Sequence, residues 1–254
     1  MPSLPSPSFV FGDRSFTPAK VIRHLAPFVG DDRQARIEAV VTGRTVSVVP
    51  VLERVHDLGN VNAVLRSAEG LGYGAAHLVG LQGDAAAWAQ ERDPDESRVE
   101  GGTGRARRQS QGADKWLDLH LWPDAASACD GLRAQGYRIA ATHLAADAVP
   151  IGAVDFTVPT ALVFGNERDG ISDALLARAD LNVVLPIDGF IQSYNISVAA
   201  ALGLYHARQD RLRRQGFHGD LSGDERLALA ARYYVHSVKA AAPILARIAR
   251  GESR

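Results

Sequence analysis

The chain has 254 residues, of which 46% are hydrophobic and 22% charged, and its formal net charge is −1. This length allows one large domain or one core with appendages, and no apolar run is long enough to span a bilayer. Residues 1–15 lack a basic start followed by an apolar block, so we expect a flexible leader rather than a secretory signal. A single cysteine, Cys129, excludes an internal disulfide and favours a cytoplasmic location.

Charge is distributed unevenly along the chain. Local clusters of positive charge indicate nucleic-acid binding better than the net charge does. Residues 201–254 contain ten Lys or Arg and five Asp or Glu, which leaves this segment at +5. A second basic cluster, formed by Arg105, Arg107 and Arg108, lies in a Gly-rich stretch. Such clusters are equally typical of solvated helix and loop faces, so alone they identify no ligand.

In chain order, residues 18–28 and 31–41 predict two helices, and residues 48–55, a β-branched apolar run, predict a buried strand. The next expected elements are a helix over 60–71, a strand over 75–79, a loop with a short helix over 81–112, strands over 116–121, 137–142, 160–164 and 182–185, and helices over 124–135, 172–179 and 195–214. Residues 222–248 should be helical in part, with an interruption at Pro243.

This alternation predicts an α/β fold with a mostly parallel sheet covered on both faces. We expect three parts: a leader with helices over 1–45, a core over 46–214, and a helical extension over 215–254. Phosphate-loop and dinucleotide patterns are absent from the sequence. The histidines near the expected strands lack thiolate neighbours and paired spacing, so no metal site is predicted.

The first candidate motif spans residues 59–67, Gly-Asn-Val-Asn-Ala-Val-Leu-Arg-Ser, directly after the expected strand over 48–55. In one interpretation Asn60 is a helix N-cap and Arg66 faces solvent. That leaves unexplained why Arg66 stands among apolar neighbours. In the other, both side chains point over the carboxyl end of the strand, where open α/β sheets bind ligands.

Two further motifs follow later strands. Residues 164–170, Phe-Gly-Asn-Glu-Arg-Asp-Gly, favour a turn, and their two glycines also let a ligand approach the backbone. Residues 185–197 begin with Leu-Pro and end with Ser-Tyr-Asn-Ile-Ser before a long helix. Ser193 or Asn195 can cap that helix while its free amide groups face a ligand. Taken alone, capping is the simpler interpretation.

Together the three motifs resemble those of the SPOUT-class RNA methyltransferases, specifically the TrmH family of ribose 2′-O-methyltransferases, and most closely its tRNA (guanosine-18-2′-O)-methyltransferases. The third motif matches the family pattern Pro-x-x-Gly-x-x-x-Ser-Leu-Asn-Val-Ser-x-Ala nearly throughout. The resemblance covers residues 48–214. It implies a trefoil-knotted α/β fold, S-adenosylmethionine as cofactor, RNA as substrate, and a homodimer with its active site near the subunit boundary.

By this resemblance, the catalytic residues are Asn60, Arg66, Glu167, Ser193 and Asn195. Cofactor contacts are expected from Thr142, Gly165, Leu185, Ile187 and Tyr194. The expected RNA phosphate contacts come from the basic clusters, Arg105, Arg107, Arg108, Arg211, Arg213 and Arg214. Because a guanidinium keeps its proton, Arg66 is expected either to stabilise the developing alkoxide or to bind a phosphate that accepts the proton.

Two positions depart from the family pattern. Position 59 is Gly, where the tRNA enzymes of the family usually carry His; Gly is common there among the ribosomal-RNA members. Tyr194 replaces the usual Leu. Guanosine-18 of tRNA is the leading expected substrate, because short helices flank the core and only about 45 residues precede it. A ribosomal-RNA ribose methyltransferase is the alternative within the class. A non-catalytic RNA-binding protein of the same fold and a pocket enzyme for small nucleotides are alternatives from other classes.

Overall fold

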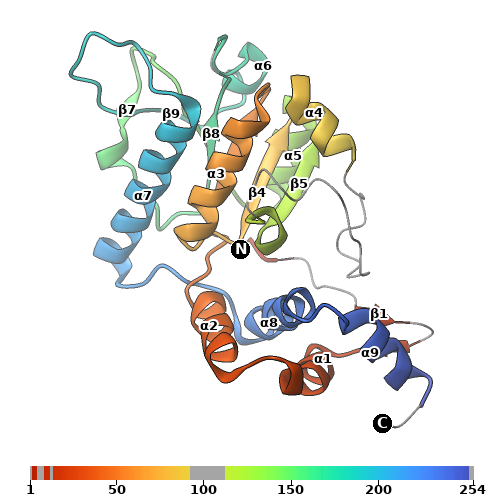
Figure 1. The fold of residues 1–254 in the computed structure, drawn as a ribbon. Coiled ribbons are helices and arrows are strands. Elements are labelled where there is room, and N and C mark those ends of the chain that lie inside the picture. The colour runs from red at the N-terminus through yellow and green to blue at the C-terminus, as the bar shows by residue number, and fades with distance from the viewer. Residues whose placement is uncertain (1, 5–8, 12–13, 92–111, 167, 252–254) are drawn as a thin grey trace. The chain divides into compact units, whose positions relative to one another are not determined.

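The computed structural model describes residues 2–4, 9–11, 14–91, 112–166 and 168–251. Within them the chain forms two compact units (Figure 1). The α/β unit is built from residues 2–3, 45–91 and the described parts of 112–218, and the helical unit from the described parts of 4–44 and 219–251. Over these ranges, no helix is both long and apolar enough to cross a membrane.

The described part of the α/β unit contains a seven-stranded sheet in the order β5-β4-β3-β8-β6-β9-β7, with every neighbouring pair parallel. This confirms the predicted parallel α/β architecture. The strands are β3 (Val48–Glu53), β4 (Ala75–Val79), β5 (Asp118–Trp122), β6 (Arg138–Thr142), β7 (Val149–Pro150), β8 (Thr160–Phe164) and β9 (Leu181–Val184). Because all of them end at one edge, the segments that follow β3, β8, β6 and β9 lie close together there.

Helices cover both faces of this sheet (Figure 1). On one face α3 (Leu58–Gly70) packs against α7 (Ile196–Gln215), and α7 contacts β3 and β8. The short α4 (Gly83–Gln90) lies beside α3. On the other face α5 (Ala125–Ala134) packs against α6 (Asp173–Leu176). Two 3₁₀ turns, Asp114–Trp116 and Ile151–Ala153, complete the unit.

Local sequence explains where these elements lie. All six residues of β3 are buried, as expected for a β-branched central strand of a parallel sheet. Helices α3, α5 and α6 each begin after a residue whose side chain accepts a first-turn amide, namely Asp57, Asp124 and Ser172. Because α3 and α6 begin just beyond the carboxyl edge of the sheet, their amide ends border the predicted site.

In the helical unit, α1 (Pro18–Leu25) and α2 (Asp31–Thr42) pack against α8 (Gly223–Ser237), and a 3₁₀ turn (Ala26–Phe28) links the first two. The expectation of a flexible leader is wrong for part of residues 1–15. There β1 (Phe9–Phe11) pairs antiparallel with β2 (Arg14–Phe16), because Phe9 and Phe11 are buried and hold this pair in place.

The interruption expected at Pro243 occurs earlier. Helix α8 ends at Ser237 and α9 (Ala241–Ala249) begins after residues 238–240. Pro243 therefore lies in the first turn of α9. Its missing N–H needs no partner there, because the first turn of a helix has no carbonyl to receive it.

Candidate active site at the carboxyl edge of the sheet

Two asparagines from distant parts of the chain meet at this edge. The Nδ2 of Asn195 donates to the Oδ1 of Asn60 at 3.3 Å, across a sequence separation of 135 positions. Helix α3 starts earlier than expected, and Asp57 accepts the Asn60 amide at 2.7 Å. The N-cap is therefore Asp57, and the Asn60 side chain contacts Asn195 rather than capping its own helix.

Asn195 has two roles in this arrangement. Its Oδ1 accepts from the Ser197 backbone N–H at 2.9 Å and from the Ser197 hydroxyl at 2.6 Å, so it caps α7. Its Nδ2 makes the contact with Asn60. The same side chain can therefore cap α7 with its oxygen and contact Asn60 with its nitrogen. Ser193 is exposed and does not cap α7.

Arg66 lies on the same helix as Asn60, six residues later, about 9 Å further along the axis. Its side chain is exposed, and within the described chain it has no hydrogen bond or ion pair. Helical side chains lean toward the N-terminus of their helix, and α3 begins at the carboxyl edge, so we expect this guanidinium to reach back toward that edge. Helix α3 therefore bears both the side-chain amide of Asn60 and an exposed arginine that has no partner among the described residues.

The loop after β8 is held in shape by Asn166, which is buried. Its Oδ1 accepts from the amides of Arg168 and Asp169 at 2.8 and 2.7 Å, and its backbone pairs with Gly170. Gly165 admits no side chain, because an added Cβ would lie 2.2 Å from the carbonyl carbon of Gly170. Glu167, expected to be catalytic, lies outside the described residues.

A buried carboxylate fastens this loop to the central strand. Glu53, the last residue of β3, accepts from the Ser172 amide at 2.9 Å and from the Ser172 hydroxyl at 2.5 Å. Neither Glu53 nor Asn166 is among the site residues expected from the sequence. The available signal for Glu53 was a carboxylate at the end of an apolar strand, six residues before the first motif, and the signal for Asn166 was its place inside the second motif.

Three of the expected cofactor residues lie near one another because the strands that they end or follow are neighbours in the sheet. Thr142 ends β6, while Gly165 and Leu185 follow β8 and β9, and these three strands are neighbours. The Thr142 hydroxyl donates to the Val163 carbonyl at 2.8 Å, which holds β6 and β8 together at this edge. Ile187 is half-buried in the loop after β9.

The loop from β9 to α7 has the polar groups that a nucleoside requires. The Tyr194 hydroxyl donates to the Pro186 carbonyl at 2.9 Å and so closes this loop. In the described structure, residues 187–193 make no backbone–backbone hydrogen bonds, so their amide and carbonyl groups are available to a ligand. The Nδ2 of Asn166 is buried without an acceptor among the described residues. Such unsatisfied polar groups suit the adenosyl group of S-adenosylmethionine, and contact between these residues and the cofactor stays a prediction.

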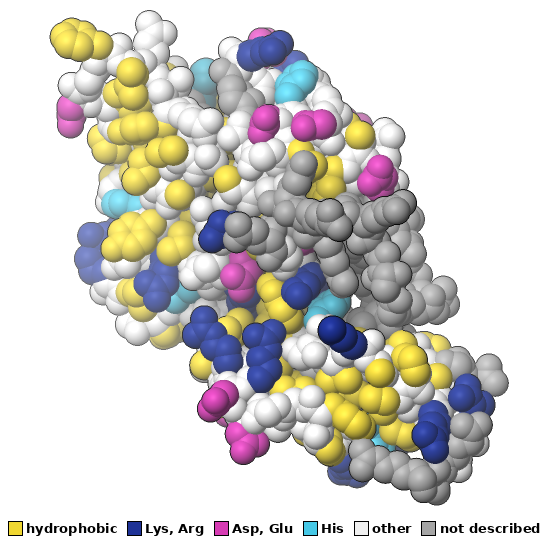
Figure 2. Space-filling view, viewed as in Figure 1, with side chains coloured by type: hydrophobic (Ala, Val, Ile, Leu, Met, Phe, Trp, Pro, Cys, Tyr) yellow, Lys and Arg dark blue, Asp and Glu magenta, His cyan; other side chains and the backbone are white. Residues whose placement is uncertain are grey.

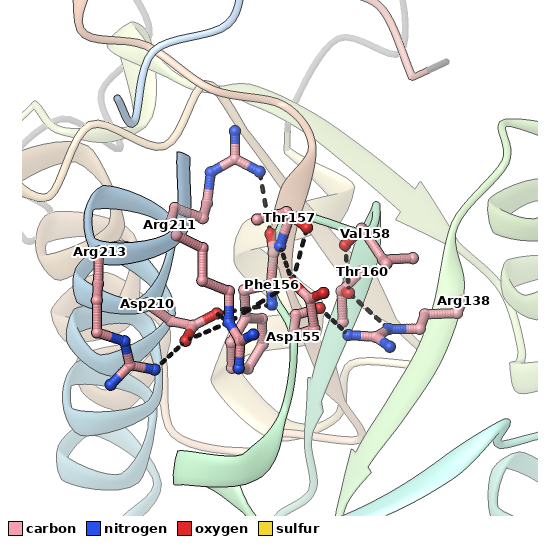
Figure 3. A network of polar contacts seen from close by, with 10 residues as sticks. Arg138, Asp155, Phe156, Thr157, Val158, Thr160, Asp210, Arg211 and Arg213 are labelled. Atoms are coloured by element: carbon pink, nitrogen blue, oxygen red, sulfur yellow. Dashed lines mark hydrogen bonds and ion pairs between the residues drawn. The ribbon is translucent and has the colours of Figure 1, made fainter. Parts of the chain in front are cut away.

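One expected RNA contact is wrong. Arg211 is buried, and its guanidinium donates to the Phe156 and His218 carbonyls at 3.0 and 3.3 Å. Figure 3 shows Arg211 on α7 beside Phe156, in the segment before β8. The basic composition of residues 201–254 does not distinguish a buried arginine such as Arg211 from an exposed one. Arg105, Arg107 and Arg108 lie outside the described residues.

Arg213 and Arg214 share one buried carboxylate, Asp210, at 2.5 and 2.9 Å. Burial by itself would raise the pKa of Asp210. The Phe156 amide, Arg214 and Arg213 outweigh that effect and hold this pKa below its usual value. Part of the positive charge at the end of α7 is therefore neutralised internally. Phosphate contact by Arg213 and Arg214 stays a prediction.

Arg54 has an unusual backbone at the same edge. Its φ is 55°, which costs a side-chain-bearing residue roughly 1–2 kcal/mol. Its Nη2 lies 3.5 Å from the Oδ2 of Asp169, and the two side chains are 35% and 62% exposed. Exposed ion pairs contribute at most about 1 kcal/mol, and this one is long, so it does not offset the backbone cost.

Known proteins resemble this chain in sequence and in fold. The tRNA (guanosine(18)-2'-O)-methyltransferase of Thermus thermophilus is 35% identical over 181 residues, which cover 71% of this chain and 84% of that protein. The A. aeolicus TrmH/SpoU tRNA modifying enzyme has a TM-score of 0.65 at 25% identity, covering 82% of this chain and 98% of that one. The SpoU methyltransferase AviRb from Streptomyces viridochromogenes, solved with the cofactor AdoMet, has a TM-score of 0.52 at 25% identity, covering 65% and 60%.

A family match agrees with these likenesses. The SpoU rRNA Methylase family matches residues 47–205. That range begins just before β3 and ends within α7, so it includes all three motifs and the contact between Asn60 and Asn195. This chain therefore belongs to the SpoU rRNA methylase family, whose members are S-adenosylmethionine-dependent RNA methyltransferases.

Proposed function

We propose that this protein methylates a ribose 2′-oxygen of RNA, with guanosine-18 of tRNA as its substrate. The contact between Asn60 and Asn195 carries the proposal, because it joins the third motif to the first turn of α3, the helix that also bears Arg66. The relative from Thermus, matched over 84% of its length, supports the choice of tRNA. A cytoplasmic location, where tRNA is modified, is part of the same proposal.

The roles proposed here are those that the three motifs suggest, and Glu167 is assigned from its motif alone because it lies outside the described residues. S-adenosylmethionine supplies a methyl group on an activated sulfonium, so the transfer needs no metal. Arg66 either stabilises the developing alkoxide at the 2′-oxygen or binds a neighbouring phosphate that accepts the proton. Asn60 and Asn195 order the site around that oxygen. Glu167 and Ser193 shape the pocket.

A ribosomal-RNA ribose is the second candidate substrate, and Gly59 is the feature that favours it. The local structure offers another cause for this glycine. A Cβ at position 59 would lie 2.8 Å from the Oδ1 of Asp57, so a larger residue would have to displace the cap of α3. Glycine at this position leaves the Asp57 cap undisturbed whichever RNA is the substrate, so Gly59 favours ribosomal RNA only as a departure from the usual His.

We also propose that the protein is a homodimer through α7. Val198, Leu202 and Tyr205 are 44–54% exposed and lie four and three residues apart, on one face of the helix. Figure 2 shows apolar side chains gathered along this helix. Light scattering should find a dimer for the wild type and a monomer for Leu202→Glu. Leu227→Glu, at an equally exposed position on α8, should leave the dimer intact.

Methyl transfer from labelled cofactor to purified tRNA and ribosomal RNA tests the function. The expected product is one labelled tRNA position, guanosine-18, mapped by the resistance of its 3′ linkage to alkaline cleavage. Label confined to ribosomal RNA would establish the alternative substrate. Cofactor binding with no labelled RNA of either kind would refute the proposal.

A further inference from the structure

Arg54 occupies a position that glycine or asparagine would fill with less strain. It is the one non-glycine residue with a positive φ in the described structure. Its amide donates to the Val79 carbonyl at 2.8 Å, which fixes the turn directly after β3. The weak ion pair with Asp169 does not account for an arginine there.

The turn at Arg54 is located between parts of the active site. The preceding residue is the buried Glu53, which holds the loop after β8 through Ser172. Helix α3, with Asn60 in its first turn, begins four residues later. The turn carries the guanidinium of Arg54 out to the rim of the carboxyl edge, where it stays partly exposed beside Asp169.

We propose that Arg54 binds a backbone phosphate of the RNA substrate at this rim, and that Asp169 holds the guanidinium in the free enzyme. The inference rests on the proposed function and adds a substrate contact to it. A planar guanidinium matches phosphate oxygens with two parallel hydrogen bonds. Backbone strain that stability does not explain is typical of ligand-binding positions.

The variant Arg54→Asn tests this inference with two readouts of opposite direction. Asparagine tolerates a positive φ, so Tm should stay unchanged or rise by about 2–4 °C. The Kd for tRNA should increase about tenfold at moderate salt, while cofactor affinity is retained. The slope of log Kd against log salt should fall by roughly 0.7–0.9, the value for one lost phosphate contact.

Two control variants separate phosphate binding from loop anchoring. Asp169→Asn breaks the ion pair but keeps Arg54, so tRNA affinity should equal or exceed that of the wild type. Arg133→Asn removes another exposed arginine, paired with Asp180 at 2.9 Å near the amino end of β9, and should leave the salt slope unchanged.

The possible results separate a failure of the Arg54 phosphate contact from a failure of the proposed RNA methyltransferase function. If the wild type binds and methylates tRNA but Arg54→Asn keeps the wild-type salt slope, the phosphate contact is refuted alone. The phosphate contact is likewise refuted if Asp169→Asn weakens tRNA binding as much as Arg54→Asn does. If the wild type binds no RNA at all, both the proposed function and the inference fail.

Discussion

Replacing Asn195 separates the two roles of its side chain. The Oδ1 caps α7 through the Ser197 amide at 2.9 Å, and the Nδ2 reaches Asn60 at 3.3 Å. Serine is an equally good N-cap, but its hydroxyl is too short to span the distance to Asn60. Asn195→Ser should therefore keep the cap and lose the link, whereas Asn195→Ala should lose both.

The expected magnitudes follow from these contacts. Loss of an N-cap costs about 1 kcal/mol, which corresponds to a Tm decrease of about 2–4 °C in a chain of this size. Only Asn195→Ala should show that decrease. A net hydrogen bond contributes roughly 0.5–1.5 kcal/mol. If the link to Asn60 positions the reacting groups, kcat/KM should fall roughly 2–10-fold in both variants.

Thermal melts and steady-state methylation of tRNA measure these quantities. A double-mutant cycle with Asn60→Ala sharpens the test, because Asn60→Ala and Asn195→Ser remove the same bond. Their losses in kcat/KM should overlap by roughly 0.5–1.5 kcal/mol rather than add. Full activity of Asn195→Ser, or strictly additive losses, would refute a catalytic role for the contact.

Three further predictions concern other parts of the α/β unit. Arg66→Lys should lower the single-turnover rate roughly 10²-fold without loss of folding, because an ammonium does not reproduce the guanidinium fork; near-normal turnover would count against this. Gly165→Ala should weaken cofactor binding by calorimetry and lower Tm, since its methyl would lie 2.2 Å from the carbonyl carbon of Gly170, whereas Gly223→Ala, at the start of α8 in the helical unit, has open space and should retain both. Burial, followed by the charge of His120, lowers the pKa of His77 to about 3. The unfolded chain then binds a proton below about pH 6.5 that the folded chain does not, so stability should decrease from pH 6.5 toward 3 by up to about 1.4 kcal/mol per pH unit. Urea unfolding at pH 7 and pH 5 should show a smaller decrease for His77→Gln; an equal one would exclude His77 as the cause.

Much of the α/β unit could be predicted because its signals are local. The β-branched run of β3 identifies a buried strand, and the apolar spacing after it identifies α3. Alternation of such elements is enough to predict a parallel sheet, which places the loops after its strands at one edge. The first motif lies in the helix that follows β3 and the other two lie mainly in the loops after β8 and β9, so the sequence also indicated the edge at which the candidate site lies.

The tertiary structure decided which side chains take part and how. Arg211 and Arg213 look alike in a basic helix, yet Arg211 is buried against two carbonyls while Arg213 stays largely exposed. The helical pattern did not distinguish Asp57 from Asn60 as the cap, and the backbone of Arg54 follows from the turn between β3 and α3. Caps, turns and periodicity act within a few residues, so sequence determines them closely. Burial and long-range partners depend on which surfaces meet when the chain folds, and no local pattern records that.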